Sequence, residues 1–531
     1  MNNLQLYLGP PGTGKTTTLL NRVEQIMDDE TLWPGDIAFC SFTRKAAYEA
    51  RDRALKKFPD LTPKDLPYWA TLHSICFRSL HLGRSDVMGR DNWHEIAKMT
   101  NSEMSGYYDI SDGTLAGGTK EGDKFLFYFG LAHAMMLGWD EVLKVLPAHE
   151  RIQVDHKKYG YFCQALTKYK RETGLMDFND MLEGAVDTGP LKGVKIAIID
   201  EAQDLSLRQW EVVRSLFANC EQVIIAGDDD QAIYEWSGAD LPTFLNLKGV
   251  TTVLDRSYRL PQKIFDYADQ IVSRIKTRFS KEWEPDNRDG NVQDIAVLDT
   301  LRERLTMNDG ESWLFLVRNA YFMTREGNEP SFVDQLKSWG VPTAIKDRTL
   351  YKADDLRAIH AWELLRSGKG ISSSDTALLY AKYLRGNSVQ IKRGFKQLPP
   401  ETPDIVTWNW LVENAGLMES KDNSWFTTQK FGAQLKPTLN AISEKDVNYY
   451  RQLRRNGFKT TDGPKMVMST IHGVKGGEAD NVIVFDAMSG RTARGLDDNP
   501  DAEHRVWYVA VTRARENLFI LRSAGDQHYP L

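Results

Sequence analysis

The chain has 531 residues, of which 41% are hydrophobic and 26% are charged, and its formal net charge is −6. This is the composition of a globular protein with ample core, and the length predicts about three or four domains. The acidic balance excludes a protein that binds nucleic acid through its overall charge. Any such binding must come from local basic and aromatic surfaces.

Cysteine usage and the N-terminal segment indicate a reducing, aqueous compartment. Cys40, Cys76, Cys163 and Cys220 are far apart and form no C-x-x-C pair, which favours buried thiols over a zinc or iron–sulfur site. A strand-like segment starts soon after Met1, which leaves no room for a signal peptide. No apolar run approaches the ~18 residues of a membrane helix. We therefore expect a cytoplasmic protein without a membrane partner.

Residues 4–27 predict a strand, a glycine loop and an amphipathic helix in direct succession. Leu4, Leu6 and Leu8 alternate with polar positions, and apolar residues then recur at helical spacing. Between them residues 9–16 read GPPGTGKT, the phosphate-cradling pattern, in the strand-to-helix context that the pattern requires. A glycine turn with an incidental lysine is the alternative, and the coincidence of strand, loop and helix argues against it.

Phosphate chemistry explains these residue types. Glycines let backbone N–H groups converge on an anion, and the helix N-terminus adds the positive end of its dipole. Lys15 is then expected on the outer phosphates, and the Thr16 hydroxyl on Mg²⁺. The predicted nucleotide contacts are Gly9, Pro10, Pro11, Gly12, Thr13, Gly14, Lys15, Thr16 and Thr17.

Two further segments combine a strand with the start of a helix. Residues 36–40 (DIAFC) read as a buried strand, and Phe42 and Thr43 stand at the edge of the helix that follows. An aromatic ring beside a hydroxyl and two cations could stack a base and hold a phosphate, although Phe42 could equally be core. At residues 71–74 (TLHS) a strand end runs into a helix, and His73 alone is more typical of a structural histidine.

The pattern loosens between residues 83 and 174. Residues 111–123 (SDGTLAGGTKEGD) read as a flexible loop, and the aromatic-rich residues 125–139 follow. These aromatics are more typical of the core of a small helical insert than of a base-stacking platform.

Acidic residues follow the next buried strand. Within residues 194–200, Ile196 to Ile199 form a continuous apolar run, as in a parallel sheet, and ligands bind at the carboxyl ends of such strands. Asp200 at that end could hold the Mg²⁺ of a bound nucleoside triphosphate. Glu201 could orient or deprotonate the attacking water, which would make a nucleotide holder a hydrolase. Mere surface charge is the alternative.

A further apolar strand, residues 222–226, ends in three aspartates and a glutamine. Gln231 could contact a γ-phosphate on one side and report its loss to Tyr234 and Trp236 on the other.

Taken together, these blocks resemble the superfamily 1 helicases of the UvrD/Rep/PcrA type. The resemblance runs through GPPGTGKT (9–16), SFTRKAA (41–47), TLHS (71–74), DFND (177–180), IIDEAQD (198–204), GDDDQAIYEWSGAD (227–240), LDRSYR (254–259), STIHGVKGGEADNVIVFD (469–486) and VWYVAVTRAREN (506–517). The DFND and DEAQD forms resemble UvrD-like members more than the Pif1/RecD-like branch. They imply 3′→5′ movement on single-stranded DNA.

The resemblance also implies roles at matching positions. Lys15 and Thr16 bind phosphate and Mg²⁺, Asp200 and Glu201 hold the metal and activate water, and Gln203 and Gln231 sense the γ-phosphate. Tyr258 stacks on adenine, Arg259 reaches the γ-phosphate, Arg513 is the arginine finger of the second motor domain, and Glu478 lies near the ribose. The positions that match the single-strand groove are Phe42, Thr43, His73, Tyr234 and Trp236, the last stacking on a base.

The fold that this resemblance implies is α/β, with two RecA-like parallel-sheet motor domains that each carry a mainly helical insertion. We expect the first motor domain at 1–83 and 175–259 with its insertion at 84–174, and the second at 260–366 and 463–531 with its insertion at 367–462. Arg513 lies after a second set of buried strands, so the nucleotide would sit between two sheets that close on ATP and part after hydrolysis. Base stacking, worth ~1–3 kcal/mol per base, would provide a grip without sequence preference.

The sequence departs from the family at its ends and in one motif. Only eight residues precede Gly9, so the upstream glutamine that reads adenine in the family has no counterpart, and selectivity for ATP over other nucleoside triphosphates is not predicted. The long C-terminal tail of the family has no counterpart either. KGGEA at residues 475–479 replaces the usual Lys-Gly-Leu-Glu-Phe.

Two functions are consistent with the sequence. The first is an ATP- and Mg²⁺-dependent 3′→5′ helicase or translocase that acts on single-stranded DNA and single-strand/duplex junctions in replication, repair or recombination. The second is a DNA-stimulated ATPase that serves as a regulatory subunit, displacing proteins or assisting a partner nuclease without processive unwinding. A small-molecule phosphotransferase is a third, and dependence of hydrolysis on single strands would exclude it.

Overall fold

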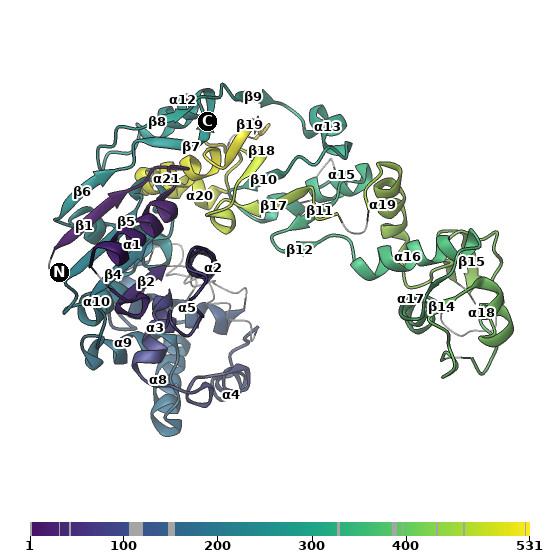
Figure 1. Cartoon of the computed structure of the whole chain (residues 1–531), viewed down its shortest axis with the longest axis horizontal. Helices are drawn as coiled ribbons and strands as arrows, with labels where there is room; N and C mark the ends of the chain where they lie inside the picture. The colour runs from purple at the N-terminus through teal and green to yellow at the C-terminus, as the bar shows by residue number, and fades with distance from the viewer. Residues whose placement is uncertain are drawn as a thin grey trace. The chain divides into compact units, whose positions relative to one another are not determined.

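The chain forms two compact units. One comprises Met1–Gly290 with Arg494–Thr512, and the other comprises Asn291–Ala493 with Arg513–Leu531. In the computed structural model, the described residues are 3–30, 32–41, 44–105, 120–146, 154–325, 330–384, 390–395, 397–431, 434–459, 462–525 and 527–531. Figure 1 shows the elements of both units, which we call unit 1 and unit 2.

A six-stranded parallel sheet is the centre of unit 1, in the order β3-β2-β4-β5-β1-β6. Its strands are β1 (Leu4–Leu8), β2 (Ile37–Ser41), β3 (Trp69–Thr71), β4 (Ile196–Asp200), β5 (Gln222–Gly227) and β6 (Val250–Val253). The four inner strands β2, β4, β5 and β1 are apolar runs or alternations, as expected for a sheet covered by helices. Because these strands are parallel, their carboxyl ends all lie at one edge of the sheet, and the motif residues that follow the strands lie at this edge.

Helices cover this sheet and complete the unit. They are α1 (Lys15–Glu30), α2 (Arg44–Lys57), α3 (Leu72–Ser79), α9 (Phe178–Thr188), α10 (Leu207–Leu216), α11 (Leu241–Leu245), α12 (Gln262–Val272) and α21 (Pro500–Val511). Short 3₁₀ turns lie at η1 (Pro34–Asp36), η3 (Ala202–Asp204), η4 (Asp229–Gln231) and η5 (Glu235–Ser237), and the pair β7 (Arg256–Pro261) and β8 (Glu284–Asp286) follows β6. Leu19, Val23 and Ile26 of α1 are buried against Ile198 and Ile224, so the apolar stripe of α1 faces the sheet.

A helical insertion separates β3 from β4. Its elements are η2 (Arg84–Asp86), α4 (Arg90–Thr100), α5 (Glu121–Ala134), α6 (Val142–Val145) and α8 (His156–Thr173). Phe125, Tyr128, Phe129 and Phe162 lie in one buried cluster, which confirms that most aromatics of this region are core. The expected loop at 111–123 falls largely outside the described residues.

Unit 2 contains a seven-stranded sheet in the order β12-β11-β17-β10-β18-β19-β9. Its strands are β9 (Asn291–Ile295), β10 (Trp313–Val317), β11 (Thr343–Ile345), β12 (Arg348–Thr349), β17 (Met466–Thr470), β18 (Ala479–Phe485) and β19 (Ala514–Leu521). All neighbours are parallel except β11 and β12. The expected α/β class with two parallel-sheet domains is therefore confirmed.

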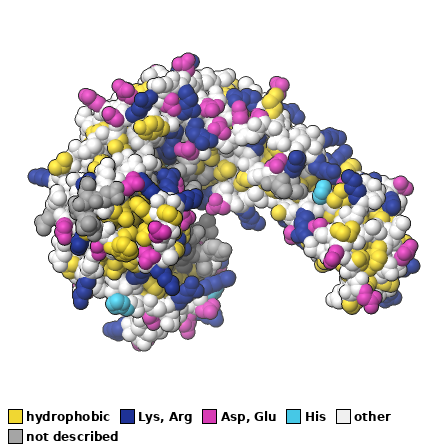
Figure 2. Space-filling model, viewed as in Figure 1, with side chains coloured by type: hydrophobic (Ala, Val, Ile, Leu, Met, Phe, Trp, Pro, Cys, Tyr) yellow, Lys and Arg dark blue, Asp and Glu magenta, His cyan; other side chains and the backbone are white. Residues whose placement is uncertain are grey.

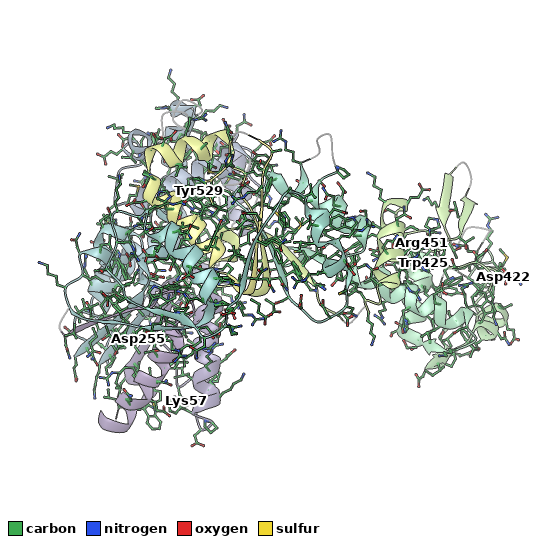
Figure 3. The ribbon with its side chains drawn as sticks, turned by 90° about the horizontal axis from the view of Figure 1, so that it is seen from above. Lys57, Asp255, Asp422, Trp425, Arg451 and Tyr529 are labelled. Carbon is green, nitrogen blue, oxygen red and sulfur yellow. The ribbon has the colours of Figure 1, made fainter. Side chains whose placement is uncertain are left out.

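The remaining elements of unit 2 include a second insertion. The helices are η6 (Leu298–Leu301), α13 (Arg302–Thr306), α14 (Tyr321–Thr324), α15 (Phe332–Trp339), α16 (Ala353–Arg366), α17 (Ser373–Leu378), the π-helix η7 (Leu379–Tyr383), α18 (Trp408–Asn414), α19 (Glu444–Arg455) and η8 (His472–Val474), while α20 (Gly490–Asp498) spans the boundary of the units. Two antiparallel strand pairs, β13 (Ile371–Ser372) with β14 (Ile405–Val406) and β15 (Thr428–Phe431) with β16 (Gln434–Pro437), complete it. Trp425, labelled in Figure 3 beside Arg451, is buried in the core of this insertion.

The compact units divide the chain differently from the expected domain boundaries. We expected the second motor domain to begin at residue 260 and to include everything after 463, whereas unit 1 continues to Gly290 and includes Arg494–Thr512. The reason is packing, because α21 lies along α12 and η4 within unit 1. The finer division into motor domains and insertions stays a prediction.

All four cysteines are free and buried. Among the described residues, no helix has both the length and the apolar character needed to cross a membrane.

A buried carboxylate supports the second insertion at its base. Asp355 of α16 is 1% exposed and accepts hydrogen bonds from Tyr383 and, at 2.8 Å, from Tyr450 of α19. Removing one donor leaves a buried charge under-solvated, at a cost of about 1.5–3 kcal/mol. We therefore expect Tyr450→Phe to lower the free energy of unfolding by this amount in urea titrations. Tyr161→Phe is the control, because that ring is exposed, and an equal effect of the two variants would contradict the role of Asp355.

Candidate nucleotide and nucleic-acid sites

The phosphate loop has the geometry that an anion cradle needs. It connects β1 to α1, which begins at Lys15, and Gly9 N–H donates to the Gly227 carbonyl at 3.0 Å. Gly12 and Gly14 both have φ of +75°, which L side chains rarely adopt. A Cβ at Gly12 would lie 2.3 Å from that of Arg259, so the close approach also requires glycine.

Lys15 is folded back over this loop. Its ammonium donates to the Gly9 carbonyl at 3.1 Å and lies 3.5 Å from Oε1 of Glu201, and its side chain is 11% exposed. The lysine is therefore at the loop and beside the residue expected to activate water. An anion in the cradle would compete for the same ammonium.

Thr16 and Asp200 meet as predicted for a metal site. The Thr16 hydroxyl donates to Oδ2 of Asp200 at 3.2 Å across a sequence separation of 184 residues. A hydroxyl and one carboxylate, with room for phosphate oxygens, fit the few protein ligands that Mg²⁺ takes in nucleotide sites. Burial and the adjacent charge of Glu201 raise the pKa of Asp200 to about 7, although Lys15 and Thr16 oppose the shift.

Glu201 sits in an uncommon backbone conformation. Its φ of 55° and ψ of 38° are left-handed, and such a conformation at a non-glycine residue is often found at functional sites. The turn lets its carboxylate face two groups, Lys15 and the amide of Gln203, which donates to Oε2 at 2.7 Å.

The two expected sensor glutamines are linked through Asp228. Gln203 Oε1 accepts the Asp228 backbone N–H at 3.1 Å, and Gln231 donates to Oδ2 of Asp228 at 2.7 Å. Both glutamines are buried, at 0% and 6% exposure. A continuous hydrogen-bonded chain therefore runs from Glu201 through Gln203 and Asp228 to Gln231.

A cluster of charged side chains that the sequence did not reveal includes Asp228, the middle member of these hydrogen bonds. The ammonium of Lys281, fully buried, lies 2.7 Å from Asp228, 2.5 Å from Asp229 and 2.7 Å from Asp230. Although burial disfavours its charge, the three carboxylates raise the pKa of Lys281 above its ordinary value. Arg278 adds two bonds to Asp230, at 2.8 and 2.6 Å. These carboxylates are thus the ligands of a cation supplied by the chain itself.

Tyr258 and Arg259 lie beside the phosphate loop, as their expected roles require. Tyr258 N–H donates to the Gly12 carbonyl at 2.9 Å, and its ring is 72% exposed. The hydroxyl of Ser257 donates to the Pro11 carbonyl at 2.8 Å, which holds the following two residues against the loop. An exposed ring at this point is available for stacking on a base.

The expected DNA-contacting residues differ in exposure. Trp236 is 47% exposed and stacks on Phe127 of α5 with ring centroids 6.0 Å apart and planes at 19°. Tyr234 is only 8% exposed. His73 lies edge-on to Phe178 at 5.8 Å, and burial and Arg44 lower its pKa to about 4, so its imidazole is neutral at pH 7. Phe42 and Thr43 lie outside the described residues.

Arg513 and Glu478 belong to unit 2. Arg513 is 1% exposed and donates to the Gly477 carbonyl at 3.4 Å, while Glu478 lies 3.6 Å from Arg515. Their approach to the nucleotide stays a prediction.

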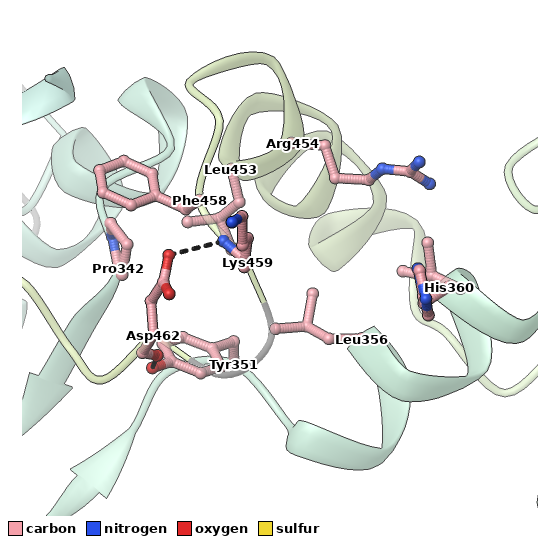
Figure 4. A pocket seen from close by; sticks show the side chains of 10 residues that line it. Pro342, Tyr351, Leu356, His360, Leu453, Arg454, Phe458, Lys459 and Asp462 are labelled. Atoms are coloured by element: carbon pink, nitrogen blue, oxygen red, sulfur yellow. Dashed lines mark hydrogen bonds between the residues drawn. The ribbon is translucent and has the colours of Figure 1, made fainter. Parts of the chain in front are cut away.

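Other concave and charged surfaces lie apart from these residues. A cavity of about 310 Å³ is lined by Tyr351, Leu356, Leu453 and Arg454 at the base of the second insertion, and it contains none of the expected site residues (Figure 4). On the face shown in Figure 2, positive and negative side chains are interspersed. Binding of a polyanion there would have to use local groups.

Comparison with known proteins places most of the chain in one family. Residues 2–251 match the UvrD/REP helicase N-terminal domain and residues 430–524 match the UvrD-like helicase C-terminal domain, together more than half of the chain. The chain belongs to the UvrD/Rep helicase family. The recognition made from the motifs is thereby confirmed, and so is the enzyme class, a helicase-type ATPase.

Individual relatives of this helicase are distant. The ATP-dependent DNA helicase Rep of Buchnera aphidicola is 25% identical over 98% of this chain and 91% of that protein. The ATP-dependent DNA helicase PcrA of Staphylococcus aureus is 22% identical over 66% of this chain, and a probable DNA helicase II homolog of Mycoplasma capricolum is 24% identical over 52%. The latter two matches cover 48% and 40% of the relatives, which is less than half of their length.

Sequence reasoning missed Lys281, Arg278 and Phe127 as partners of the expected site residues. The three consecutive aspartates at the end of a buried strand were a usable signal, because buried carboxylates require a counter-charge. Nothing in residues 278–281 (RFSK) indicates which cation provides it. Phe127 was assigned to the insert core with its neighbours, yet it backs Trp236.

The raised pKa of Asp200 predicts a pH-dependent stability. A carboxyl whose pKa rises from 3.8 to about 7 on folding stabilises the protein while protonated, and this contribution is lost as the pH rises through 7. The unfolding free energy of Asp200→Asn minus that of the parent should therefore increase by about 2.5 kcal/mol between pH 5 and pH 8. Thermal unfolding without added metal or nucleotide measures it.

Asp480→Asn provides the control for this prediction. Burial opposes its charge, but bonds from Ser312 hold the pKa of Asp480 below its ordinary value, so its difference from the parent should stay constant over the same range. A flat difference for Asp200→Asn as well would contradict the assigned protonation.

Proposed function

We propose that this helicase is an ATP-dependent motor that moves 3′→5′ on single-stranded DNA and separates duplex at single-strand/duplex junctions. One observation carries the proposal. The bonded chain from Glu201 to Gln231 continues along the backbone into the loop of Trp236, so the hydrolytic residues and the exposed stacking ring are parts of one connected loop system.

Each nucleotide-site residue has a role that fits its position. Lys15 and Arg259 provide cationic charge beside the glycine cradle, and Tyr258 offers its exposed ring to the base. Thr16 and Asp200 would hold Mg²⁺, which supplies charge neutralisation on the phosphate oxygens. Glu201 orients the attacking water, and Gln203 holds the Glu201 carboxylate in place through a 2.7 Å bond.

Sensing and clamping complete the proposed cycle. Gln203 and Gln231 detect the γ-phosphate, and loss of that group changes the bonds that both make to Asp228. By family resemblance, Arg513 enters as the arginine finger and Glu478 lies near the ribose. Closure and opening of the two motor domains would then follow the nucleotide state.

We propose that the protein holds single-stranded DNA mainly by stacking of aromatic side chains on the bases. Trp236, backed by Phe127, offers one exposed aromatic face, and Phe42, Thr43, His73 and Tyr234 are proposed to line the same groove. A neutral His73 would contact sugar or base edges and not pair with phosphate as a cation. Stacking accepts every base, so we expect no strong sequence preference.

A polarity-resolved strand-separation assay tests this function. With ATP and Mg²⁺, the protein should separate 3′-tailed duplexes and leave 5′-tailed duplexes intact, and single-stranded DNA should stimulate hydrolysis. Glu201→Gln is the control, because it should bind nucleotide like the parent and lose turnover by about 10²-fold or more.

Each other outcome has a definite meaning. Hydrolysis stimulated by DNA without separation on either tail would replace the motor by the regulatory ATPase. Separation of 5′-tailed duplexes alone would reverse the polarity. Equal hydrolysis with and without DNA would contradict both functions and leave a phosphotransferase. Replacing ATP with GTP in the same assay measures how strictly adenine is read.

A further inference from the structure

Helix α21 carries a buried arginine that the proposed chemistry does not use. Arg505 is 2% exposed, and its Nε donates to the Asp229 carbonyl at 2.9 Å. One Nη donates to the Thr277 carbonyl at 2.5 Å, and the other lies 3.4 Å from the Glu235 carboxylate. All four residues belong to unit 1, so these contacts lie inside one compact body.

The two ends of this guanidinium reach different parts of the loop system. Asp229 follows Asp228, the residue that binds the amides of Gln203 and Gln231. Glu235 precedes Trp236, the half-exposed ring stacked on Phe127. A single side chain therefore touches the nucleotide-sensing end and the DNA-stacking end of residues 227–238.

A second residue of α21 binds the stretch of chain that supplies the cations of the ion cluster. Asp501, one turn earlier on α21, accepts the backbone N–H groups of Lys276 and Thr277 at 3.0 and 2.9 Å. The same stretch of chain then supplies Arg278 and Lys281 to the carboxylates of residues 228–230. The α21 helix and residues 228–230 are thus both bonded to the same stretch, residues 276–281.

The guanidinium of Arg505 is rigid, so its bonds can transmit a movement from one partner to another in addition to stabilising the fold. A guanidinium is planar, and its donors have a fixed fork geometry, so three acceptors that bind it cannot shift independently without breaking a bond. A displacement at Asp229 must therefore be followed at Glu235 or at α21. Arg513, the expected arginine finger, comes only two residues after the end of this helix.

We propose that Arg505 is a positioning residue that couples the nucleotide state sensed at Gln231 to the grip of Trp236 on single-stranded DNA. The inference rests on the proposed function, because it assumes that one protein binds both ligands. Arg505 touches neither ligand. Its effect is on the interaction between the two sites, which is by definition a coupling free energy and is reciprocal.

The coupling can be measured as a ratio of affinities. The dissociation constant for a labelled oligo-dT strand is measured by anisotropy with and without adenylyl imidodiphosphate and Mg²⁺. Allosteric ratios of about 5–150-fold are typical, and Arg505→Met should bring the parent's ratio about fivefold or more towards 1. Hydrolysis without DNA should stay within about twofold of the parent.

Lys465→Met is a matched control in unit 2. Lys465 is also a buried cation that binds two carbonyl groups, those of Arg304 at 2.9 Å and Met307 at 2.5 Å, and one carboxylate, Asp309 at 2.8 Å. The Lys465→Met variant should be destabilised as Arg505→Met is, but its ratio of DNA affinities with and without nucleotide should equal that of the parent. Glu235→Gln, which removes only the charge of one partner, should reduce the ratio in the same direction and decides the question if Arg505→Met does not fold.

Three results would overturn parts of the account, and they can be told apart. An unchanged ratio in Arg505→Met and Glu235→Gln contradicts the coupling role alone. A fall of hydrolysis without DNA as large as the fall of the ratio also contradicts it, because Arg505 would then act on the chemistry. A parent protein in which neither ligand affects the other contradicts the proposed function itself.

Discussion

Three carboxylates at the end of one strand are removed from water and held by a single ammonium group. Asp228, Asp229 and Asp230 each lie within 2.7 Å of Lys281, and all four side chains are at most 1% exposed. An ion moved into a protein interior loses several kcal/mol of solvation, and only close, well-oriented partners offset the loss. The cluster therefore restrains the loop after β5, and with it Asp228, to which Gln203 and Gln231 are both bonded.

A series of hydrogen bonds and one ion pair connects the loop after β5 to the phosphate loop. Gln231 and Gln203 bind Asp228 from two sides, and Gln203 positions the carboxylate of Glu201. Glu201 in turn faces Lys15 of the phosphate loop at 3.5 Å. Local propensity explains little of this arrangement, since Glu201 adopts a left-handed conformation. Long-range bonds hold it there, as is common where a site stores strain.

Apolar patterning explains why much of the fold could be predicted. The strands at residues 37–41, 196–200 and 222–227 coincide within one or two residues with apolar runs from which strands were expected. GPPGTGKT could be interpreted because its chemistry is local, with glycines, lysine and threonine in one turn. Trp236 could be found because it stands in a motif, and its exposure of 47% agrees with a surface role.

Long-range ionic partners were beyond the reach of the sequence. Lys281 lies 51 residues from Asp230 in a segment without a pattern, and Arg505 comes from a part of the chain that we expected in the second motor domain. Phe127 shares its apolar spacing with core neighbours, so periodicity cannot show that it faces Trp236. Such pairings also decide which segments pack into unit 1, which continues to Gly290 and includes α21.

Amide hydrogen exchange of residues 222–231 in Lys281→Met tests the central role of the buried cluster most directly. Removing the ammonium leaves three buried carboxylates without their shared partner, and the loss of ~3–5 kcal/mol should accelerate exchange by about two to four powers of ten. Lys276→Met, an exposed lysine of the same segment, should change nothing. Protection in Lys281→Met equal to that of the parent would contradict the account.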